Sequence, residues 1–364
     1  MQSVELLANI ISSAQSHELK TLLAGKIARA AAIFCVDEIV VYDDGQGNSQ
    51  KNGSSMHYSS RSRSFGNEDG YTALTDPNGF LVYLLSYLEC PPHLRKRLFP
   101  IHPNLRGVGS LPPLDIPHHI KPGEWCQYRD GVTIGPVDTP KQKLDLDTPR
   151  KRQKKDTKPP HNNTDENIHE TLVDVGFPVA VQVEIPPNTR VTVKFSDLES
   201  PPDFPYPRGP MEISSRTEPT LIAEPVSPSL PREEAGYYWG YTVRQAPSLS
   251  SVFTECPFED GYDISIGTSE RGQSIFNMLS SSSPTPLPSA VSHALVVFGG
   301  LGGLEVAAVA DVDLANKQID RSNIADLFDY YVDICPGQGS RTIRTEEAIL
   351  ITLSQLRSWT AKAI

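Results

Sequence analysis

Hydrophobic and polar positions change their spacing from one segment of the chain to the next. Residues 4–11 are an apolar, strand-like run, and residues 14–35 place leucine, isoleucine and alanine at helical intervals. Residues 38–42 (EIVVY) are rich in β-branched side chains, which predicts a short strand. A strand, a long helix and a second strand predict a βαβ unit, and such a unit implies parallel strands.

The last third of the chain carries the same alternation of strand and helix patterns. Strands are expected at 262–266, 293–298 and 329–334, and an amphipathic helix at 344–359. Two α/β portions therefore bracket the middle of the chain. The simplest assembly is one α/β domain with a parallel sheet, interrupted by an inserted domain.

The middle of the chain predicts a small β module. Residues 128–134 and 172–193 alternate apolar and polar side chains, as short antiparallel strands do. Residues 138–170 between them are dominated by charged and turn-forming side chains. The polar, Gly- and Ser-rich segment 43–70 is expected to be disordered, and the proline-rich segment 201–231 to be an extended linker that closes the module.

Composition locates these connections more closely. The chain has 32 prolines among its 364 residues, nearly 9%, against about 5% in an average protein. Much of the excess falls in the expected linker. We therefore expect a folded core with proline-rich connections, and the length suggests roughly two domains of about 150 residues.

The charge is unevenly distributed. The chain has 33 Lys and Arg against 44 Asp and Glu, a formal charge of −11. Residues 141–158 hold eight Lys and Arg and three Asp, a balance of +5, so the remainder sums to −16. A solvated linker, a nuclear-localisation signal and a tether for a phosphate backbone all fit this stretch. The acidic total argues against indiscriminate coating of nucleic acid but allows local, salt-sensitive contact.

Three classes of protein are disfavoured. The longest apolar run, 294–304, has 11 residues, whereas a membrane-spanning helix needs about 20. No Lys or Arg precedes Lys20, so we expect no secretory or transit peptide and an intracellular protein. The five cysteines are scattered and never spaced as C-x-x-C, which predicts reduced thiols and no structural zinc.

Three loops in the last third each follow an expected strand: 267–272 (GTSERG), 299–305 (GGLGGLE) and 335–347 (CPGQGSRTIRTEE). Ligands of parallel α/β sheets bind outside the carboxyl ends of the strands, and glycines allow close backbone approach. We therefore expect the loops to share one pocket. A dinucleotide-binding turn is disfavoured because Glu305 stands where G-x-G-x-x-G needs its third glycine, and P-loop, G-x-S-x-G and H-E-x-x-H motifs do not occur.

Seven motifs, in order along the chain, resemble those of one family. They are AQS-x-EL-x-T-x-LAG-x-IARA at 14–30, VDEIVVYDD at 36–44, LxPLDxPHH at 111–119, GYYWGYTVR at 236–244, PFEDGYDISIGTSERG at 257–272, HALVVFGGLGGLE at 293–305 and CPGQGSRTIRTEEAIL at 335–350. Together they resemble the SPOUT-class RNA methyltransferases of eukaryotes and archaea. The resemblance spans the chain except for 43–70, 138–170, 201–231 and 280–290.

The resemblance implies a fold, a cofactor and partners. It implies a discontinuous SPOUT domain over 1–110 and 232–364, with a parallel sheet and a C-terminal trefoil knot, and an inserted OB-like β-barrel over 111–205 that carries the basic loop 138–170. It also implies S-adenosylmethionine as cofactor, RNA as substrate and a homodimer whose interface lies beside the pocket. No metal is expected. The expected location is the nucleus or nucleolus, with the cytoplasm as a further possibility.

Carried over residue by residue, the family's cofactor contacts fall on Arg271, Gly299, Asp333 and Ile334. The resemblance implies that neighbouring backbone completes the pocket: Gly300, Cys335, Gly339, Ser340, Thr342 and Ile343. A carboxylate such as Asp333 suits a ribose diol, and a guanidinium such as Arg271 suits the methionine carboxylate, although the pairings stay open. The alternative for Arg271 is a structural ion pair with Glu270 or Glu305.

Methyl transfer from a sulfonium is an in-line displacement, so catalysis depends mostly on positioning, plus a base where the acceptor loses a proton. Arg244 and Arg344 are the candidate catalytic residues, with Arg341 beside them, because a guanidinium stabilises a developing ring anion such as that of uridine N3. Glu346 and Glu347 are further candidates. The competing interpretation of both carboxylates is helix capping.

RNA contact has its own candidates. Residues 95–97 (RKR) form a basic trio, and Tyr128 and Arg129 are expected on a barrel surface suited to stacking and phosphate contact. His118 and His119 could face RNA or bind a metal, but satisfied surface or interface histidines are the favoured interpretation.

Two functions from different classes follow. The leading hypothesis is an S-adenosylmethionine-dependent RNA methyltransferase that acts on a base of ribosomal RNA, with uridine N3 as the candidate atom. The alternative is a non-catalytic RNA-binding factor of ribosome assembly, or a mitotic scaffold, that retains the fold. An oxidoreductase is a distant third.

Overall fold

The chain packs as two compact units, which the computed structural model describes at residues 2–7, 11, 14–45, 71–121, 123–136, 170–206, 221–280, 282–300 and 302–363. The first unit comprises Met1–Pro91, Phe99–His119 and Tyr238–Ile364, and the second comprises Pro92–Leu98 and Ile120–Tyr237. The loops expected to be disordered at 43–70 and 138–170 lie outside the described residues, apart from 43–45 and 170.

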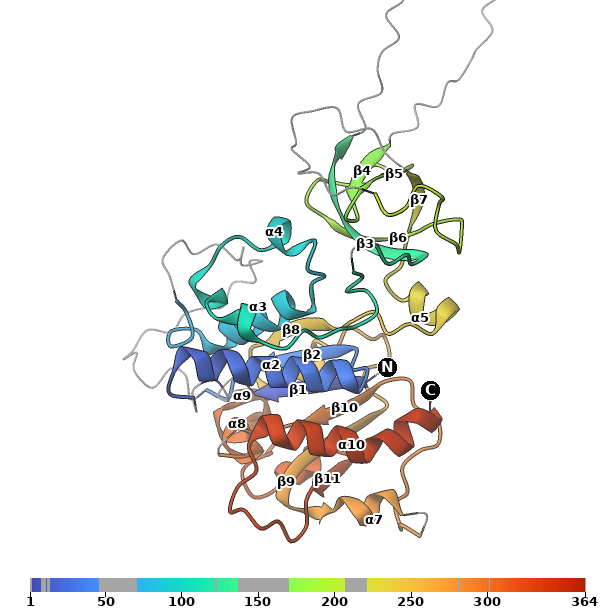
Figure 1. Cartoon of the computed structure of the whole chain (residues 1–364). Coiled ribbons are helices and arrows are strands. Elements are labelled where there is room, and N and C mark those ends of the chain that lie inside the picture. Colours follow the sequence, from blue (N-terminus) through green and yellow to red (C-terminus); the bar gives the residue numbers. More distant parts are fainter. Residues whose placement is uncertain are drawn as a thin grey trace, which may run out of the picture. The chain divides into compact units, whose positions relative to one another are not determined.

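The first unit is built on a six-stranded sheet in which every neighbouring pair of strands is parallel. In spatial order the strands are β11 (Tyr330–Asp333), β9 (Ile264–Ser274), β10 (Ala294–Val297), β1 (Gln2–Leu7), β2 (Glu38–Tyr42) and β8 (Thr242–Ala246). The N-terminal strands β1 and β2 therefore lie together between strands of the last third of the chain, within one sheet (Figure 1). The prediction of parallel strands at the N-terminus is confirmed, because β1 and β2 pair in parallel.

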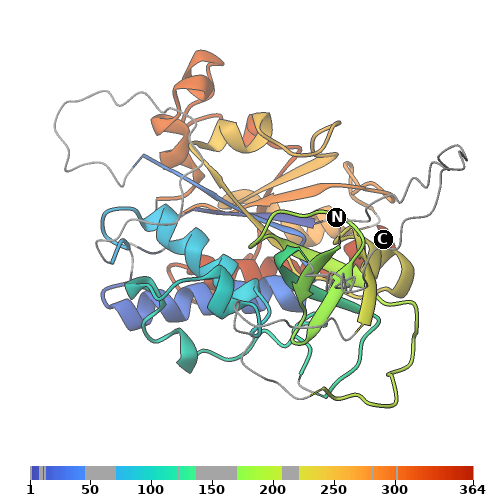
Figure 2. The ribbon, with the colours of Figure 1, turned by 90° about the horizontal axis from the view of Figure 1, so that it is seen from above.

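Helices cover both faces of this sheet. Figure 2 shows α2 and α10 side by side on one face, with α8 and α9 on the other side. The side chain of Ser16 accepts a hydrogen bond from the Leu19 amide and so begins α2. The helices of this unit are α2 (His17–Ile33), α3 (Pro77–Glu89), α6 (Leu249–Thr254), α7 (Ile275–Leu279), α8 (Leu304–Ala310), α9 (Val312–Asn316) and α10 (Thr345–Ala363), with 3-10 turns η2 (Pro103–Leu105), η3 (Val108–Ser110) and η4 (Ile324–Leu327).

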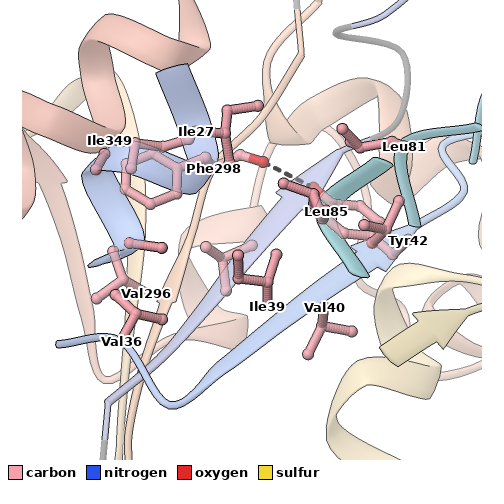
Figure 3. Close-up of a cluster of buried hydrophobic side chains, with 14 of the residues drawn as sticks. Ile27, Val36, Ile39, Val40, Tyr42, Leu81, Leu85, Val296, Phe298 and Ile349 are labelled. Carbon is pink, nitrogen blue, oxygen red and sulfur yellow. Dashed lines mark hydrogen bonds between the residues drawn. The ribbon is translucent and has the colours of Figure 1, made fainter. Parts of the chain in front are cut away.

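The core of the first unit lies where helices pack on the central strands (Figure 3). Ile27, Ile39 and Leu85 are almost fully buried there. The Tyr42 hydroxyl donates a hydrogen bond to the Phe298 carbonyl at 3.2 Å, which satisfies the one polar group that this tyrosine brings into the core. Each such aliphatic side chain contributes about 1.5–3 kcal/mol through burial, so this cluster fixes the strand ends that carry the loops.

The second unit is a closed five-stranded barrel with the strand order β3-β4-β5-β7-β6. Its β5 and β7 pair in parallel, and the other pairs are antiparallel. Valines at alternate strand positions fill the interior, together with Phe177 and Phe195. The elements are β3 (Tyr128–Pro136), β4 (Thr171–Asp174), β5 (Pro178–Val181), β6 (Arg190–Lys194), β7 (Leu221–Val226), α4 (Arg95–Leu98) and α5 (Leu230–Ala235).

One expected connection is a structural element. The segment 201–231 was expected to be a linker, but it contains β7, which closes the barrel between β5 and β6. Leu221 and Ala223 pack against the barrel core, while Ile222 and Glu224 are exposed. This alternation is a strand pattern that the surrounding prolines obscured. Residues 207–220 lie outside the described part of the chain.

In the part of the chain that the structure describes, no helix combines the length and apolar character needed to span a bilayer.

Candidate active site

The carboxyl ends of β9, β10 and β11 meet at one edge of the sheet, because these strands are parallel neighbours. The first loop, 267–272, interrupts the hydrogen-bonded pairing of β9 with β11. Tyr331 of β11 pairs with Gly267 of β9, but the next residue, Val332, pairs with Gln273. Residues 268–272 therefore bulge out of the ladder. The loops expected to share a pocket thus leave the same part of the sheet.

Two glycines allow backbone segments of these loops to pack against each other. A Cβ atom added at Gly272 would lie 2.5 Å from the Val332 nitrogen, and one at Gly299 would lie 2.6 Å from the Leu304 nitrogen. Neither distance is tolerated by a real side chain, so both positions need glycine. The Thr345 hydroxyl donates to the Gly299 carbonyl at 3.1 Å, which ties the start of α10 to the second loop.

Arg271 lies on the bulge and forms an ion pair. Its Nη1 is 3.4 Å from Oε1 of Glu305, at the start of α8. The Arg271 side chain is 69% exposed, whereas Glu305 is nearly buried. Of the two partners considered for an ion pair, Glu305 is therefore the one found. A largely exposed guanidinium held by one carboxylate still has donors available for a ligand.

The third loop begins at the end of β11. Asp333 Oδ1 accepts a hydrogen bond from the Cys335 amide at 3.0 Å, which turns the chain out of the strand. Ile334 is buried, and its carbonyl accepts from Gln355 Nε2 at 2.8 Å. Further along, the Ser340 hydroxyl donates to the Thr342 carbonyl at 2.8 Å. A Cβ atom added at Gly339 would meet no heavy atom of another segment within 4 Å, so the backbone there faces open space.

A pocket of about 400 Å³ adjoins these loops. The second and third loops contribute Gly300 and Ile343, both expected at the cofactor site. No residue of the first loop, 267–272, lines this pocket. The start of α10 and the start of α2 supply the rest: Arg344, Thr345, Glu346, Ala14, Gln15, Leu19, Leu22, Leu23 and Lys26. A pocket with mostly apolar walls and a few convergent polar groups is the usual form of a ligand site.

The two glutamates at the start of α10 differ in their contacts. Glu347 Oε2 accepts a hydrogen bond from the Arg344 amide at 3.0 Å and so caps the helix. Glu346 instead lines the pocket, is 7% exposed, and lies 3.8 Å from Nζ of Lys26. The capping interpretation therefore holds for Glu347, and Glu346 belongs to the pocket.

The two candidate catalytic arginines lie in different places. Arg344 lines the pocket. Arg244 lies on β8. Its Nε donates a hydrogen bond to Glu38 Oε1 at 2.9 Å, and its Nη2 donates one to the Tyr262 hydroxyl at 3.0 Å. Glu38 begins β2 and Tyr262 precedes β9, so this guanidinium points toward the amino ends of the strands. The expectation that Arg244 faces the site is corrected, because the loops leave the opposite ends.

The adjacent histidines His118 and His119 both contact Glu89. His118 is fully buried, and its Nε2 lies 2.9 Å from Glu89 Oε1. His119 Nε2 lies 2.5 Å from the Glu89 carbonyl. Among the described residues, no group of three or more His, Cys, Asp or Glu is arranged to hold a metal ion.

The barrel residues expected to stack on RNA are buried. Tyr128 donates a hydrogen bond to Glu234, and Arg129 lies 5.2 Å from the ring centroid of Phe177 and is only 6% exposed. Both side chains therefore stabilise the barrel, and their expected place on its surface is corrected. In the basic trio, Arg97 Nε pairs with Asp174 Oδ2 at 3.2 Å, while Lys96 is exposed.

Sequence reasoning missed the contribution of α2 to the site. The pocket takes Gln15, Leu19 and Lys26 from a segment that follows the first strand, far from the three loops in sequence. The signal that could have found it was the position of the AQS-x-EL motif directly after a strand of the same sheet, where ligand-binding segments begin.

Comparison with known proteins assigns the chain to a described family. The model of a family described as "Putative RNA methyltransferase" matches residues 2–356. A human protein named "28S rRNA (uridine-N(3))-methyltransferase" is 41% identical over 360 residues, which cover 98% of this chain and 77% of that protein. The mouse protein of the same name is 42% identical (98% and 75%), and the Drosophila melanogaster protein is 37% identical (98% and 61%).

Proposed function

The chain belongs to this RNA methyltransferase family, and we propose that it transfers a methyl group from S-adenosylmethionine to N3 of a uridine in large-subunit ribosomal RNA. The observation that carries the proposal is the pocket, which joins Gly300 and Ile343 of the cofactor loops to the start of α2. The activity named for the animal relatives supports the choice of uridine N3 as the acceptor.

We assign the first unit to the SPOUT class, with its C-terminal segment tied as a trefoil knot. Two sets of contacts support the assignment. β11 pairs with β9 at one edge of the sheet, whereas α10, which follows it, packs against α2. Along α10, Gln355 donates a hydrogen bond to the Ile334 carbonyl, and Trp359 donates one to the Pro288 carbonyl. The last helix is therefore held by two separate segments that come earlier in the chain.

The residues of the loops fit S-adenosylmethionine. The exposed guanidinium of Arg271 suits the methionine carboxylate, and the Asp333 carboxylate suits the ribose hydroxyls. The open backbone at Gly339 leaves room for a flat ring. We propose that backbone groups of the neighbouring residues complete the contacts: Gly299, Gly300, Ile334, Cys335, Ser340, Thr342 and Ile343. When bound, this cofactor supplies the activated methyl group.

The chain's own residues supply orientation and electrostatics. The leucines of α2 give the pocket apolar walls, and charge interactions inside it strengthen once a bound substrate displaces water from those walls. Arg344 at the pocket wall stabilises the negative charge that develops on the ring when N3 loses its proton. Positioning of the acceptor nitrogen against the methyl group contributes most to the rate of transfer, because displacement at carbon needs an in-line approach.

We propose that the second unit is an OB-type barrel that holds RNA. Its strand order, with one parallel pair between β5 and β7, is that of a five-stranded Greek-key barrel, a fold used to bind oligonucleotides. The basic stretch 141–158 follows β3 in sequence and lies outside the described residues. Its charge supports a role in contacting phosphates.

We further propose a homodimer whose interface lies beside the pocket. Ile33 of α2 and Leu350 of α10 are each more than 40% exposed, neither lines the pocket, and the two helices are neighbours in the fold. Large exposed apolar side chains on adjacent helices are typical of an interface between subunits. A nuclear or nucleolar location, with a cytoplasmic fraction, fits a protein that acts on ribosomal RNA.

Calorimetric titration with S-adenosylmethionine tests the cofactor assignment. The wild type is expected to bind, and Arg271→Ala to bind at least tenfold more weakly, as expected when a charge-assisted hydrogen bond of about 1.5–3 kcal/mol is removed. Arg321→Ala, an exposed arginine of the same unit, is the matched control and is expected to bind normally. Absence of binding by the wild type contradicts the proposal.

Modification mapping in cells separates an enzyme from a non-catalytic assembly factor. Cells that lack the protein are expected to lose methylation at one or more uridines of the large-subunit RNA. Gly299→Arg, whose side chain has no room beside Leu304, is expected not to restore it. Full rescue of growth by this variant, without methylation, would favour the assembly-factor alternative.

A further inference from the structure

We propose that Glu346 accepts the N3 proton of the target uridine, in a base-binding pocket formed by the starts of α2 and α10. The inference rests on the proposed function and deepens it, because it assigns the acceptor site and a catalytic residue within it.

The shape and lining of the pocket suit a pyrimidine nucleotide. Its volume of about 400 Å³ lies in the range of small-ligand sites. Leu19, Leu22 and Ile343 offer apolar walls for the two faces of a base. Gln15 offers both a donor and an acceptor for the ring edge, whose two carbonyls flank the N3 proton.

Glu346 is a buried carboxylate with spare hydrogen-bonding capacity. It is 7% exposed, and its one charged partner within the described residues is Lys26, at 3.8 Å. That separation exceeds hydrogen-bond distance, and no described residue donates a hydrogen bond to the carboxylate. Glu346 lines the pocket, so its oxygens are free to accept a hydrogen bond from a donor that enters with a ligand. The N3–H group of uridine is such a donor.

The neighbouring glutamate provides an internal comparison. Glu347 already accepts the Arg344 amide as a helix cap, so its carboxylate is engaged. Two adjacent residues of the same type therefore have different roles, which follow from the faces of α10 on which they lie.

The step balances with groups already named. The N3 proton moves to the Glu346 carboxylate, and the N3 electron pair forms a bond to the methyl carbon. The bond between that carbon and the sulfonium sulfur breaks, and its electron pair stays on sulfur as a neutral thioether. The charged groups that line the pocket with Glu346 are Lys26 from α2 and Arg344, which directly precedes α10. Glu347 is engaged as the helix cap and does not line the pocket. Arg344 favours the ring anion.

Single-turnover methylation of a ribosomal RNA fragment, measured across a range of pH, tests the inference with Glu346→Gln and Glu347→Gln as a matched pair. Glu346→Gln is expected to be slower by about 10²-fold or more near neutral pH, the usual contribution of a general base. Its rate is expected to rise in proportion to hydroxide, because solvent must then remove the proton. Glu347→Gln is expected to keep the profile of the wild type.

Two binding measurements distinguish a catalytic role from a structural one. Affinity for S-adenosylhomocysteine and for the RNA fragment is expected to be the same in Glu346→Gln and the wild type. A loss of cofactor affinity as large as the loss of rate overturns the inference. If the wild type is active and Glu346→Gln keeps the same rate and pH profile, the role of Glu346 is overturned. The proposed function is unaffected by that outcome.

Glu346→Asp is the second variant, because it keeps a negative charge beside Lys26 and so preserves the folded pocket. It is expected to react more slowly than the wild type but to retain the same dependence on pH. A rate proportional to hydroxide in this variant overturns the inference. A wild type that binds no cofactor and methylates no RNA overturns the proposed function, and the inference with it.

Discussion

Glu89 Oε1 lies 2.9 Å from Nε2 of His118, and both side chains are buried in the first unit. Trp239 packs against this pair, with its ring centroid 5.6 Å from that of His118. The chain leaves the first unit after Pro91 and again after His119, and it returns at Tyr238. The pair therefore joins three segments within the first unit, each next to a point where the chain crosses between units.

Replacing Glu89 with alanine is expected to lower the free energy of unfolding by about 3 kcal/mol, because it leaves a buried imidazole without its carboxylate. Urea unfolding followed by tryptophan fluorescence, to which Trp239 beside the pair contributes, measures the change. Glu255→Ala removes an exposed carboxylate of the same unit and is expected to cost no more than about 0.5 kcal/mol. Equal effects of the two substitutions would contradict a structural role for the pair.

Gly240 is expected to tolerate no side chain. It has a φ of +90°, and an added Cβ would lie 2.5 Å from Cε1 of His118 and closer still to Glu89 Oε1. Gly261→Ala is the matched control, because Gly261 has a φ of +74° but no atom within 4 Å of that position. Both variants carry the left-handed strain of about 1–2 kcal/mol. Thermal unfolding is expected to show a clearly lower Tm for Gly240→Ala, and similar Tm values would refute the crowding.

Asp263 is expected to contribute to stability only where it is ionised. Its carboxylate accepts hydrogen bonds from the backbone amides of His293 at 2.8 Å and Ser292 at 2.6 Å, and these bonds lower the pKa of Asp263 below 3.8. The folded pKa is thus below the unfolded one, so the contribution is complete above the unfolded pKa and is lost as pH falls through the folded value.

The stability difference between the wild type and Asp263→Asn is therefore expected to be constant near neutral pH and to shrink as pH falls below about 5. Urea unfolding at a series of pH values measures it. Because this carboxylate is exposed, we expect a small difference. A difference that grows in acid would contradict the sign of the shift.

The basic stretch 141–158 is expected to contact RNA phosphates. Replacing its eight Lys and Arg with glutamine should weaken binding to different RNA sequences equally. It should also flatten the plot of log affinity against log salt concentration by about 0.7–0.9 for each phosphate that the variant no longer neutralises. Arg232→Ala, on α5 of the barrel unit, serves as the single-charge control. An unchanged slope together with loss of nuclear localisation would favour the localisation signal.

The sequence by itself determined that the chain combines a parallel α/β sheet with a small β module. Strand and helix periods are local properties, so the runs around 38–42 and 14–35 were sufficient to predict the parallel pair β1 and β2 and the helix between them. Glycines at 299–305 marked the carboxyl end of β10 for the same reason, whereas 267–272, expected to follow a strand, form a bulge within β9. The strand β7 was not predicted, because prolines surround and interrupt its short alternating pattern of apolar and polar residues.

Only the tertiary structure decided which side chains face the site. Glu346 and Glu347 are indistinguishable in sequence, but one lines the pocket and the other caps α10. Arg244 was a candidate catalytic residue, but it pairs with Glu38 near the amino ends of the strands, away from the loops. Tyr128 looked like a stacking surface, but it is buried in the barrel unit. Burial and contact depend on segments far apart in the chain, and no local pattern records which of them come together.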